Sequence, residues 1–205
     1  MYHNNLQSAL ENFHGVTDIK DEKQKMTRLS EQFHDIAEEV ITRGCFEING
    51  IRRIYPVEIE FYYHEEGGGN LKDPVMYHTC DNKASEYYEL GSLNPHISGI
   101  DVTFENKDKE YRASFLIRAY KVDEFDGEKW SSQKLENRPT YLYEDMFMNL
   151  PISNGINVRW ITLNTNDSPT IYEKPRVNVA KYQKNGEGKY VKEQITQQEY
   201  ENRRR

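Results

Sequence analysis

The chain has 205 residues, of which 36% are hydrophobic and 30% charged, and its formal net charge is −7 at pH 7. This length suits one domain, and the 15 Tyr and 8 Phe supply the bulky apolar surface that disordered chains lack. The negative charge argues against a protein that coats nucleic acid nonspecifically, because phosphate binding depends on Lys and Arg. No apolar run approaches the roughly 20 residues that cross a bilayer, and the first residues lack a secretory-signal pattern, so we expect a cytoplasmic protein with no membrane partner.

Neither the cysteines nor the histidines follow a metal-binding pattern. Cys45 and Cys80, the only two cysteines, lie in no CxxC or Cys/His zinc spacing, and no HxH or HExxH motif occurs. The glycine-rich stretch at 65–74 lacks the GxxxxGK pattern of a phosphate-binding loop. A zinc or iron site would have to use residues of suitable chemistry without that spacing: His64, His78, His96 and Glu60. We therefore expect no metal and no organic cofactor.

Helical periodicity dominates the N-terminal part of the chain. Over residues 28–44, Leu29, Phe33, Ile36 and Val40 recur at helical spacing, and Gly44 supplies a helix stop. A weaker helical pattern covers residues 6–13. The sequence thus predicts an N-terminal helical segment over residues 1–48.

After residue 50 the pattern changes to the period of two that is typical of strands. In residues 57–64 the apolar side chains alternate with polar ones. The first set is Val57, Ile59, Phe61 and Tyr63, and the second is Glu58, Glu60, Tyr62 and His64. This segment is expected to be a strand with one apolar and one polar face.

The remaining elements complete an α+β arrangement. Residues 98–105 and 111–120 read as strands joined by the polar turn 106–110, which predicts a β-hairpin. Further strands are expected at 156–163 and 175–182, and a short helix at 138–150. We predict one compact domain with a largely antiparallel sheet, a mixed α/β core over 49–184, and a polar tail at 185–205 for which little order is expected.

Glu60 is the residue that sequence reasoning singles out for chemistry. A carboxylate on the polar face of a half-apolar strand, beside Tyr62, is placed where a desolvated general base could be held. Most carboxylates in such positions are merely solvated or ion-paired, so the pattern alone leaves both readings open.

Four short motifs occur in the order of the alkyladenine (3-methyladenine) DNA glycosylase family. The segment RIYPVEIEFYY at 53–63 resembles that family's RIVETEAY-type strand, and FLIRAYKV at 115–122 resembles its VLLRALEP strand. Residues 137–147, NRPTYLYEDMF, are similar to its GPxxLxxAL helix, and residues 173–182, EKPRVNVAKY, to its PRVGI strand. The resemblance covers roughly residues 50–182 and implies the curved sheet of the glycosylase fold.

The resemblance also implies roles for individual residues. Glu60 matches the glutamate that activates water, Tyr62 the tyrosine that stacks on the flipped base, and Arg118 the arginine near the phosphate and the catalytic glutamate. His78 in DPVMYHT stands where the family has a histidine that helps to hold the base. Supporting roles are expected for three further residues: Glu58, His64 and Arg176. The expected activity is hydrolysis of the N-glycosidic bond of a modified base in DNA.

One segment departs from the family pattern. Where the family has a Tyr-rich YVYIIYGM hairpin that stacks on the base and wedges into the duplex, this chain has NPHISGID at 94–101. Pro95 or His96 would have to replace the stacking Tyr, and Ser98 the wedge. This loss favours the alternative of a non-catalytic module that binds a nucleotide, nucleic acid or a partner on the same fold. The sequence does not determine the base, the strandedness of the substrate or the oligomeric state.

Overall fold

The longest helix, α2 (Glu22–Thr42), begins earlier than the apolar periodicity predicts. Asp21 caps it by accepting a 2.8 Å hydrogen bond from the N–H of Gln24, which satisfies one of the orphan donors of the first turn. Its apolar stripe is buried against the sheet, with Leu29 and Ile36 among the core residues. The helix ends before Gly44, which is the first residue of the next strand rather than part of the helix.

Aromatic rings connect the helical segment to the sheet. The short helix α1 (Asn5–Glu11), at the position of the weaker helical pattern, packs beside α2 and buries Leu6 and Leu10. Just after α1, the ring of Phe13 stacks on Phe33 of α2 with centroids 5.6 Å apart. Phe33 in turn stacks on Phe61 of the sheet at 4.3 Å, so one column of rings joins α1, α2 and the sheet.

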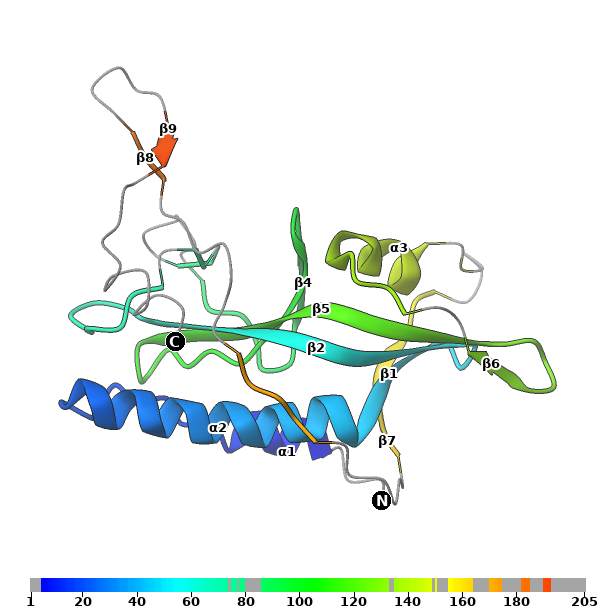
Figure 1. Cartoon of the computed structure of the whole chain (residues 1–205), viewed down its shortest axis with the longest axis horizontal. Helices are drawn as coiled ribbons and strands as arrows, with labels where there is room; N and C mark the ends of the chain where they lie inside the picture. Colours follow the sequence, from blue (N-terminus) through cyan, green and yellow to red (C-terminus); the bar gives the residue numbers. More distant parts are fainter. Residues whose placement is uncertain are drawn as a thin grey trace.

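The structure is a computed structural model, and it is an α+β fold with N-terminal helices and a curled, half-barrel antiparallel sheet (Figure 1). It describes residues 5–73, 75–76, 78–79, 86–132, 135–148, 150, 155–163, 170–174, 182–184 and 190–192. The strands are β1 (Gly44–Ile48), β2 (Arg52–Glu65), β3 (Leu93–His96), β4 (Gly99–Thr103), β5 (Tyr111–Phe125), β6 (Trp130–Ser132) and β7 (Val158–Thr162). Their order is β3-β4-β5-β2-β1-β7, with β6 paired to the end of β5. A separate two-stranded hairpin is formed by β8 (Tyr182–Lys184) and β9 (Tyr190–Lys192).

Most of the predicted elements are confirmed. The predicted hairpin is β4–β5, the predicted strand at 156–163 contains β7, and the predicted helix contains η2 (Pro139–Tyr141) and α3 (Leu142–Phe147). The strand β1 was missed: residues 44–48 were assigned to the helical segment, but they pair with both β2 and β7. All five are buried, so no polar alternation marks them as a strand. The strand predicted at 175–182 lies outside the described residues, apart from Tyr182, which begins β8.

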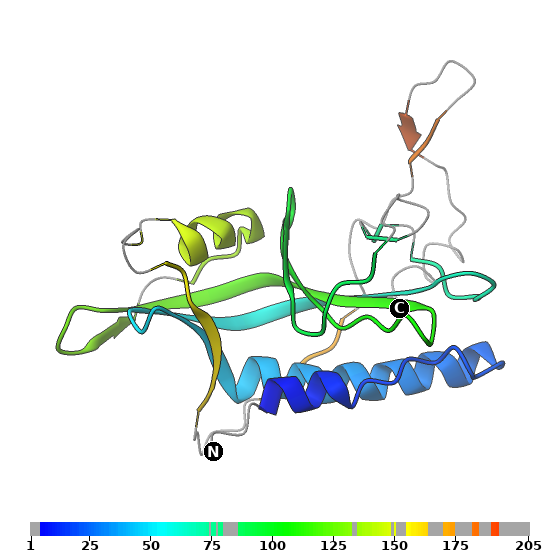
Figure 2. The ribbon, with the colours of Figure 1, turned by 180° about the vertical axis from the view of Figure 1, so that it is seen from behind.

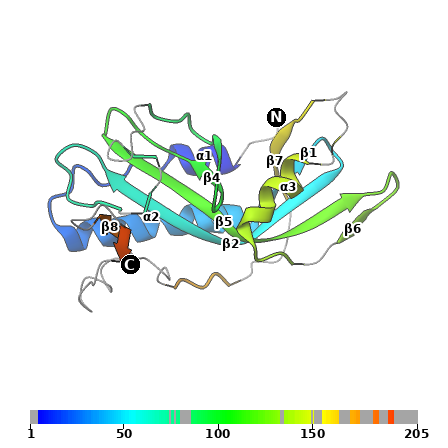
Figure 3. The ribbon, with the colours of Figure 1, turned by 90° about the horizontal axis from the view of Figure 1, so that it is seen from above.

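The two faces of the sheet differ in what covers them. Helices α1 and α2 lie along one face, which we call the helix face, and α3 lies on the other (Figures 1 and 2). Seen from above, β2 and β5 form the long axis of the sheet, with α2 beneath them (Figure 3). The β2–β5 register shifts between Pro56 and Ile59, an irregularity of the kind that bends a strand. Among the described residues, no helix combines the length and apolar character needed to cross a membrane.

A buried ion pair fastens α2 to the end of β2. Lys25 contacts the carboxylate of Glu65, and the two side chains are only 4% and 0% exposed. The second oxygen of Glu65 accepts hydrogen bonds from the N–H groups of Asn70 and Leu71, at 2.8 and 3.1 Å. The carboxylate therefore holds α2, β2 and the following turn together, and its charge is fully compensated.

We predict that Lys25→Met destabilises the fold by about 3 kcal/mol, because the change leaves the buried Glu65 carboxylate without its cation. Urea denaturation would measure this. Lys23→Met, at an exposed position of the same helix, is the matched control and should change stability by less than about 0.5 kcal/mol. Equal stability of the two variants would contradict the assigned role of the ion pair.

Candidate active site

The face of β2, β5 and β4 opposite α1 and α2 is called the polar face here, and strand pairing arranges its side chains in rows. Residues that pair directly on neighbouring antiparallel strands project to the same face. Leu116 of β5 pairs with both Glu60 of β2 and Asp101 of β4, so these three form one row. At a strand spacing of about 4.8 Å, the Cα atoms of Glu60 and Asp101 are about 10 Å apart. This row of the polar face therefore carries one carboxylate on each side of Leu116.

Glu60 and Arg118, the two residues predicted to be catalytic, are brought together. Arg118 is two positions along β5 from Leu116 and shares its face. Its Nε lies 3.5 Å from Oε2 of Glu60, and the two side chains are 37% and 17% exposed, respectively. The pair is thus partly open to solvent, in contrast to the more deeply buried charges elsewhere on this face.

Of the two neighbours of Glu60 in the predicted polar set, Tyr62 follows the predicted alternation, whereas Glu58 lies in the register irregularity and pairs with Ala119. Tyr62 pairs with Ser114 in the next row and is half-buried, so its ring is on the same face as the Glu60 carboxylate. Glu58 has a more exposed position, 2.7 Å from the Nζ of Lys174. The polar face predicted from the sequence is therefore present, whereas the roles assigned to its residues stay predictions.

A continuous series of buried ionisable side chains lies across the polar face, and we call it the ionic row. Each member contacts the next in the order His96, Asp101, His78, Glu105, Arg112, Glu66 and His64. The most exposed side chain of the row is that of His96, at 12%. Buried ionisable groups are costly to desolvate, and the alternation of acidic and basic side chains along the row offsets much of that cost.

His78 lies at the centre of this row, between two carboxylates. Its Nε2 is 3.6 Å from Oδ2 of Asp101, and its Nδ1 contacts Oε1 of Glu105. Burial would lower the pKa of His78, but the hydrogen bonds and charges of Asp101 and Glu105 outweigh it and raise the pKa to about 9. Burial would likewise raise the pKa of Asp101, but its contacts with His78 and His96 hold that pKa below its usual value. His78 is therefore a cation at neutral pH.

His96 forms the outer end of the row, on the β3–β4 hairpin. Its Nε2 lies 3.1 Å from Oδ1 of Asp101, and its Nδ1 accepts a 3.2 Å hydrogen bond from the N–H of Ser98. Both ring nitrogens of His78 and of His96 thus face protein groups. The predicted contact of either histidine with a base would have to use the face of its ring.

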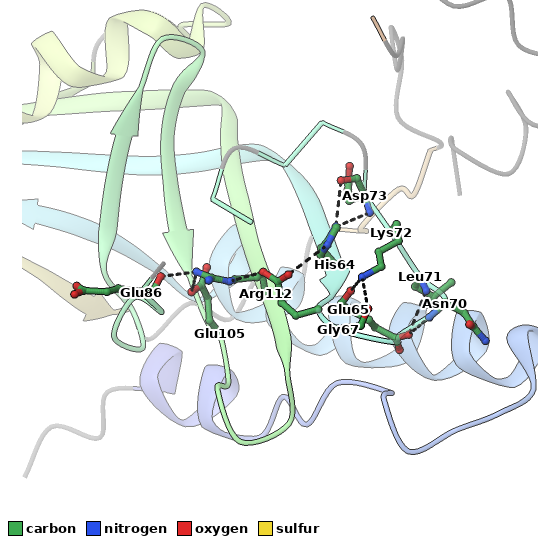
Figure 4. Close-up of polar contacts among 11 residues, drawn as sticks. His64, Glu65, Gly67, Asn70, Leu71, Lys72, Asp73, Glu86, Glu105 and Arg112 are labelled. Carbon is green, nitrogen blue, oxygen red and sulfur yellow. Dashed lines mark hydrogen bonds and ion pairs between the residues drawn. The ribbon is translucent and has the colours of Figure 1, made fainter. Parts of the chain in front are cut away.

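Arg112 is fully buried and makes the contacts of the inner half of the row, which Figure 4 shows. Its guanidinium lies 2.9 Å from Glu66 and 3.1 Å from Glu105, and it also donates to the carbonyl of Glu86. The ring of Tyr87 covers it at 3.9 Å, a cation–π contact. Arg112 therefore attaches the chain around residues 86–87, which precedes β3, to the sheet.

His64, predicted as a supporting residue, closes the inner end of the row. Its Nδ1 accepts a hydrogen bond from the N–H of Asp73 at 3.1 Å, and its Nε2 is 3.8 Å from Glu66 (Figure 4). Sequence reasoning missed Asp101, Glu105 and Arg112, because each belongs to an ordinary strand or turn pattern. The available signal was the pairing of His64 with Arg112 once the β2–β5 register is known. Arg176, the third supporting residue, lies outside the described residues.

The tip of the β3–β4 hairpin exposes a large apolar side chain beside this face. Ile97 is 84% exposed, and the hairpin rises from the sheet on the same side as α3 (Figure 1). Gly99, the first residue of β4, has a φ of 141°, and a Cβ at this position would lie 2.9 Å from the Leu116 side chain. Only glycine fits this position, so the hairpin is packed closely onto the row that contains Glu60.

Two further features bear on ligand chemistry. A cavity of about 340 Å³ lies between α1 and the edge strands, lined by Leu10, Phe46, Leu93 and Trp160 among others, and no predicted site residue lines it. Within the part of the chain that the structure describes, no three His, Cys, Asp or Glu side chains are grouped as metal ligands.

No family model, no curated protein and no solved structure matches this chain. The resemblance to the alkyladenine DNA glycosylase family therefore rests on the sequence motifs alone, and it stays a prediction.

We predict that the stability of the fold falls as the pH rises from about 6.5 through about 9. The pKa of His78 is raised on folding, so its contribution is complete below the ordinary value of 6.5 and is lost through about 9. The loss should be on the order of 2–3 kcal/mol. Urea denaturation at pH 6.5, 8 and 9.5 would measure it.

The matched control for this prediction is His78→Gln, which has no charge to lose. Its unfolding free energy should be lower than that of the wild type at pH 6.5, and the difference should shrink towards pH 9.5. Parallel pH profiles for the two proteins would contradict a charged His78.

Proposed function

We propose that this chain is a hydrolase that cleaves the N-glycosidic bond of a modified base flipped out of DNA, on a fold like that of the alkyladenine DNA glycosylases. The observation that carries the proposal is the contact between Glu60 and Arg118 on a partly open face, beside Tyr62. The motifs assign these three residues to catalysis and base stacking, and the pairing of β2 with β5 is what brings them together.

In the proposed mechanism, Glu60 acts as the general base. Its carboxylate polarises a water molecule that attacks C1′ of the sugar, and the C1′–N bond to the base breaks as the new C1′–O bond forms. The proton of the water passes to Glu60, and the base leaves with the electron pair of the broken bond. Arg118, next to the carboxylate, orients it and offers a cation to a nearby phosphate.

Tyr62 would receive the flipped base on its ring, because it is one row from Glu60 on the same face. Base–aromatic stacking contributes about 1–3 kcal/mol per base. No metal ion or organic cofactor takes part in these steps.

The β3–β4 hairpin supplies a candidate for the wedge, in place of the family's Tyr-rich hairpin. A flipped base leaves a gap in the stack, and apolar side chains such as Ile are commonly inserted into such gaps. Ile97, rather than the Ser98 expected from the sequence, is the exposed side chain at the tip. We assign the wedge role to Ile97.

We predict that Glu60→Gln lowers the rate of base release at least about 100-fold, because the amide cannot accept the proton of the water. Free base released from oligonucleotides that carry alkylated, deaminated and hypermodified bases would be quantified. Affinity for the same oligonucleotides should be retained, since the variant keeps the shape of the site.

Glu124→Gln is the matched control, because Glu124 is an exposed carboxylate on β5 that pairs with Arg52 and has no assigned role in the site. It should release base at close to the wild-type rate. Equal loss of activity in both variants would contradict the assignment of Glu60 as the base.

We predict that Ile97→Ala reduces base release from duplex substrates about tenfold and leaves release from single strands unchanged, because only a duplex has a stacked gap to fill. Ile51→Ala, which removes an exposed isoleucine in the turn between β1 and β2, is the control and should affect neither substrate. An equal effect of Ile97→Ala on both substrates would contradict the wedge.

One observation favours a second candidate, a non-catalytic module that binds a nucleotide, nucleic acid or a partner. The ring nitrogens of His78 and His96 are directed at protein groups, so neither histidine presents a donor that could recognise a leaving base. Under this candidate, wild type and Glu60→Gln bind modified oligonucleotides equally and neither releases a base.

A further inference from the structure

We infer that Asp101 is a positioning residue that joins two segments beside the Glu60 site through His96 and His78: the β3–β4 hairpin, and the preceding chain at residues 78–79 and 86–88. That these two segments flank a catalytic site rests on the proposed function of the polar face. Their connection to each other through Asp101 is a property of the fold, and it is tested without a substrate.

Asp101 is connected to both segments by separate oxygens. Oδ1 is 3.1 Å from Nε2 of His96 in the hairpin, and Oδ2 is 3.6 Å from Nε2 of His78 in the preceding chain. Ser114 of β5 adds a 3.4 Å hydrogen bond to Oδ2. The Asp101 side chain is only 4% exposed, so water competes little for these contacts.

Glu105 holds the same preceding chain from the other end. One of its oxygens contacts Nδ1 of His78, and the other accepts from the N–H of Tyr88 at 2.9 Å and from Arg112 at 3.1 Å. The rings of Tyr88 and His78 pack in a T-shaped contact with centroids 5.4 Å apart. The charged groups that face His78 are therefore Asp101 and Glu105, with His96 and Arg112 next along the row.

The position of His78 between two carboxylates favours the doubly protonated ring. A neutral imidazole carries one N–H and one bare nitrogen, whereas both nitrogens of His78 face carboxylates. Loss of one proton therefore sets a lone pair against either Asp101 or Glu105, and that contact becomes repulsive. Deprotonation of His78 should weaken the attachment of residues 78–79 and 86–88 to the sheet. Through Asp101, it should also weaken the attachment of the hairpin that carries Ile97.

An apolar row would avoid the cost of burying these charges, and replacement of buried ion pairs by apolar residues is often neutral or stabilising. What the charged row adds is a defined set of partners, because each carboxylate is held by particular donors and cations from different segments. Asp101 uses this to fix the His96 ring and, through the bond from Ser98 to His96, the tip of the hairpin. The hairpin position is thus set by Asp101 and not by backbone pairing alone.

The test compares Asp101→Asn with Ser114→Ala by two measurements. Ring-proton NMR would follow the titration of His78 and His96, and hydrogen exchange would follow the amides of residues 86–92 and 93–99. Asp101→Asn should lower the titration midpoint of His78 by at least about one pH unit. It should also reduce protection in both segments about tenfold. Ser114→Ala removes only the third contact of Asp101 and should leave protection within about twofold.

A second form of the test uses the wild-type protein and therefore does not depend on whether a variant folds. Between pH 7 and 10, the protection factors of both segments should fall together, with the midpoint at which the His78 ring titrates. The inference is overturned if His78 titrates near 6.5, or if the two segments respond independently to pH or to Asp101→Asn. A chain that releases no base would sink the proposed function and leave this test intact.

Discussion

A protonated imidazole between two buried carboxylates is the interaction on which the polar face depends. His78 lies in the chain between β2 and β3, and Asp101 and Glu105 lie on and after β4, so their contacts tie a long connection to the sheet. Removing either carboxylate from water costs several kcal/mol, and the cation between them offsets this. Arg112 of β5 likewise lies between two carboxylates, Glu105 and Glu66, and His64 of β2 contacts Glu66 at the end of the row. The polar face is thus held by charged contacts, whereas the helix face is held by aromatic packing together with the Lys25–Glu65 ion pair.

The difference between the two faces of the sheet determines where the candidate catalytic side chains lie. Side chains alternate along β2, so Phe61 and Tyr63 point to α1 and α2 while Glu60 and Tyr62 point to the polar face. The stacking of Phe61 on Phe33 of α2 determines which of the two sets faces the helices. Gly99 allows the hairpin to approach the Glu60 row closely, so an exposed apolar tip and a partly open carboxylate occur on one side of the sheet. The proposed glycosylase activity uses both features.

Sequence reasoning identified what depends on local periodicity. The alternation from Glu58 to His64 predicts the strand and its faces, and the polar turn at 106–110 predicts the β4–β5 hairpin. It missed β1, which is buried on both sides and shows no alternation. It also missed the ionic row, because His78, Asp101 and Arg112 are distant in sequence and are joined only by strand order and register. His96 and His78 were chosen as base-binding residues by resemblance, and no periodicity could reveal that their nitrogens face protein groups.

The most direct test of the central claim does not require the identity of the base. Hydrolysis of an N-glycosidic bond passes through a cation-like sugar, which a pyrrolidine abasic-site analogue imitates and a tetrahydrofuran analogue does not. If Glu60 and its neighbours stabilise that charge, the chain should bind oligonucleotides with the pyrrolidine at least on the order of 100-fold more tightly than those with the tetrahydrofuran. Glu60→Gln should remove most of this preference. Equal affinity of the wild-type protein for the two oligonucleotides would contradict a catalytic polar face.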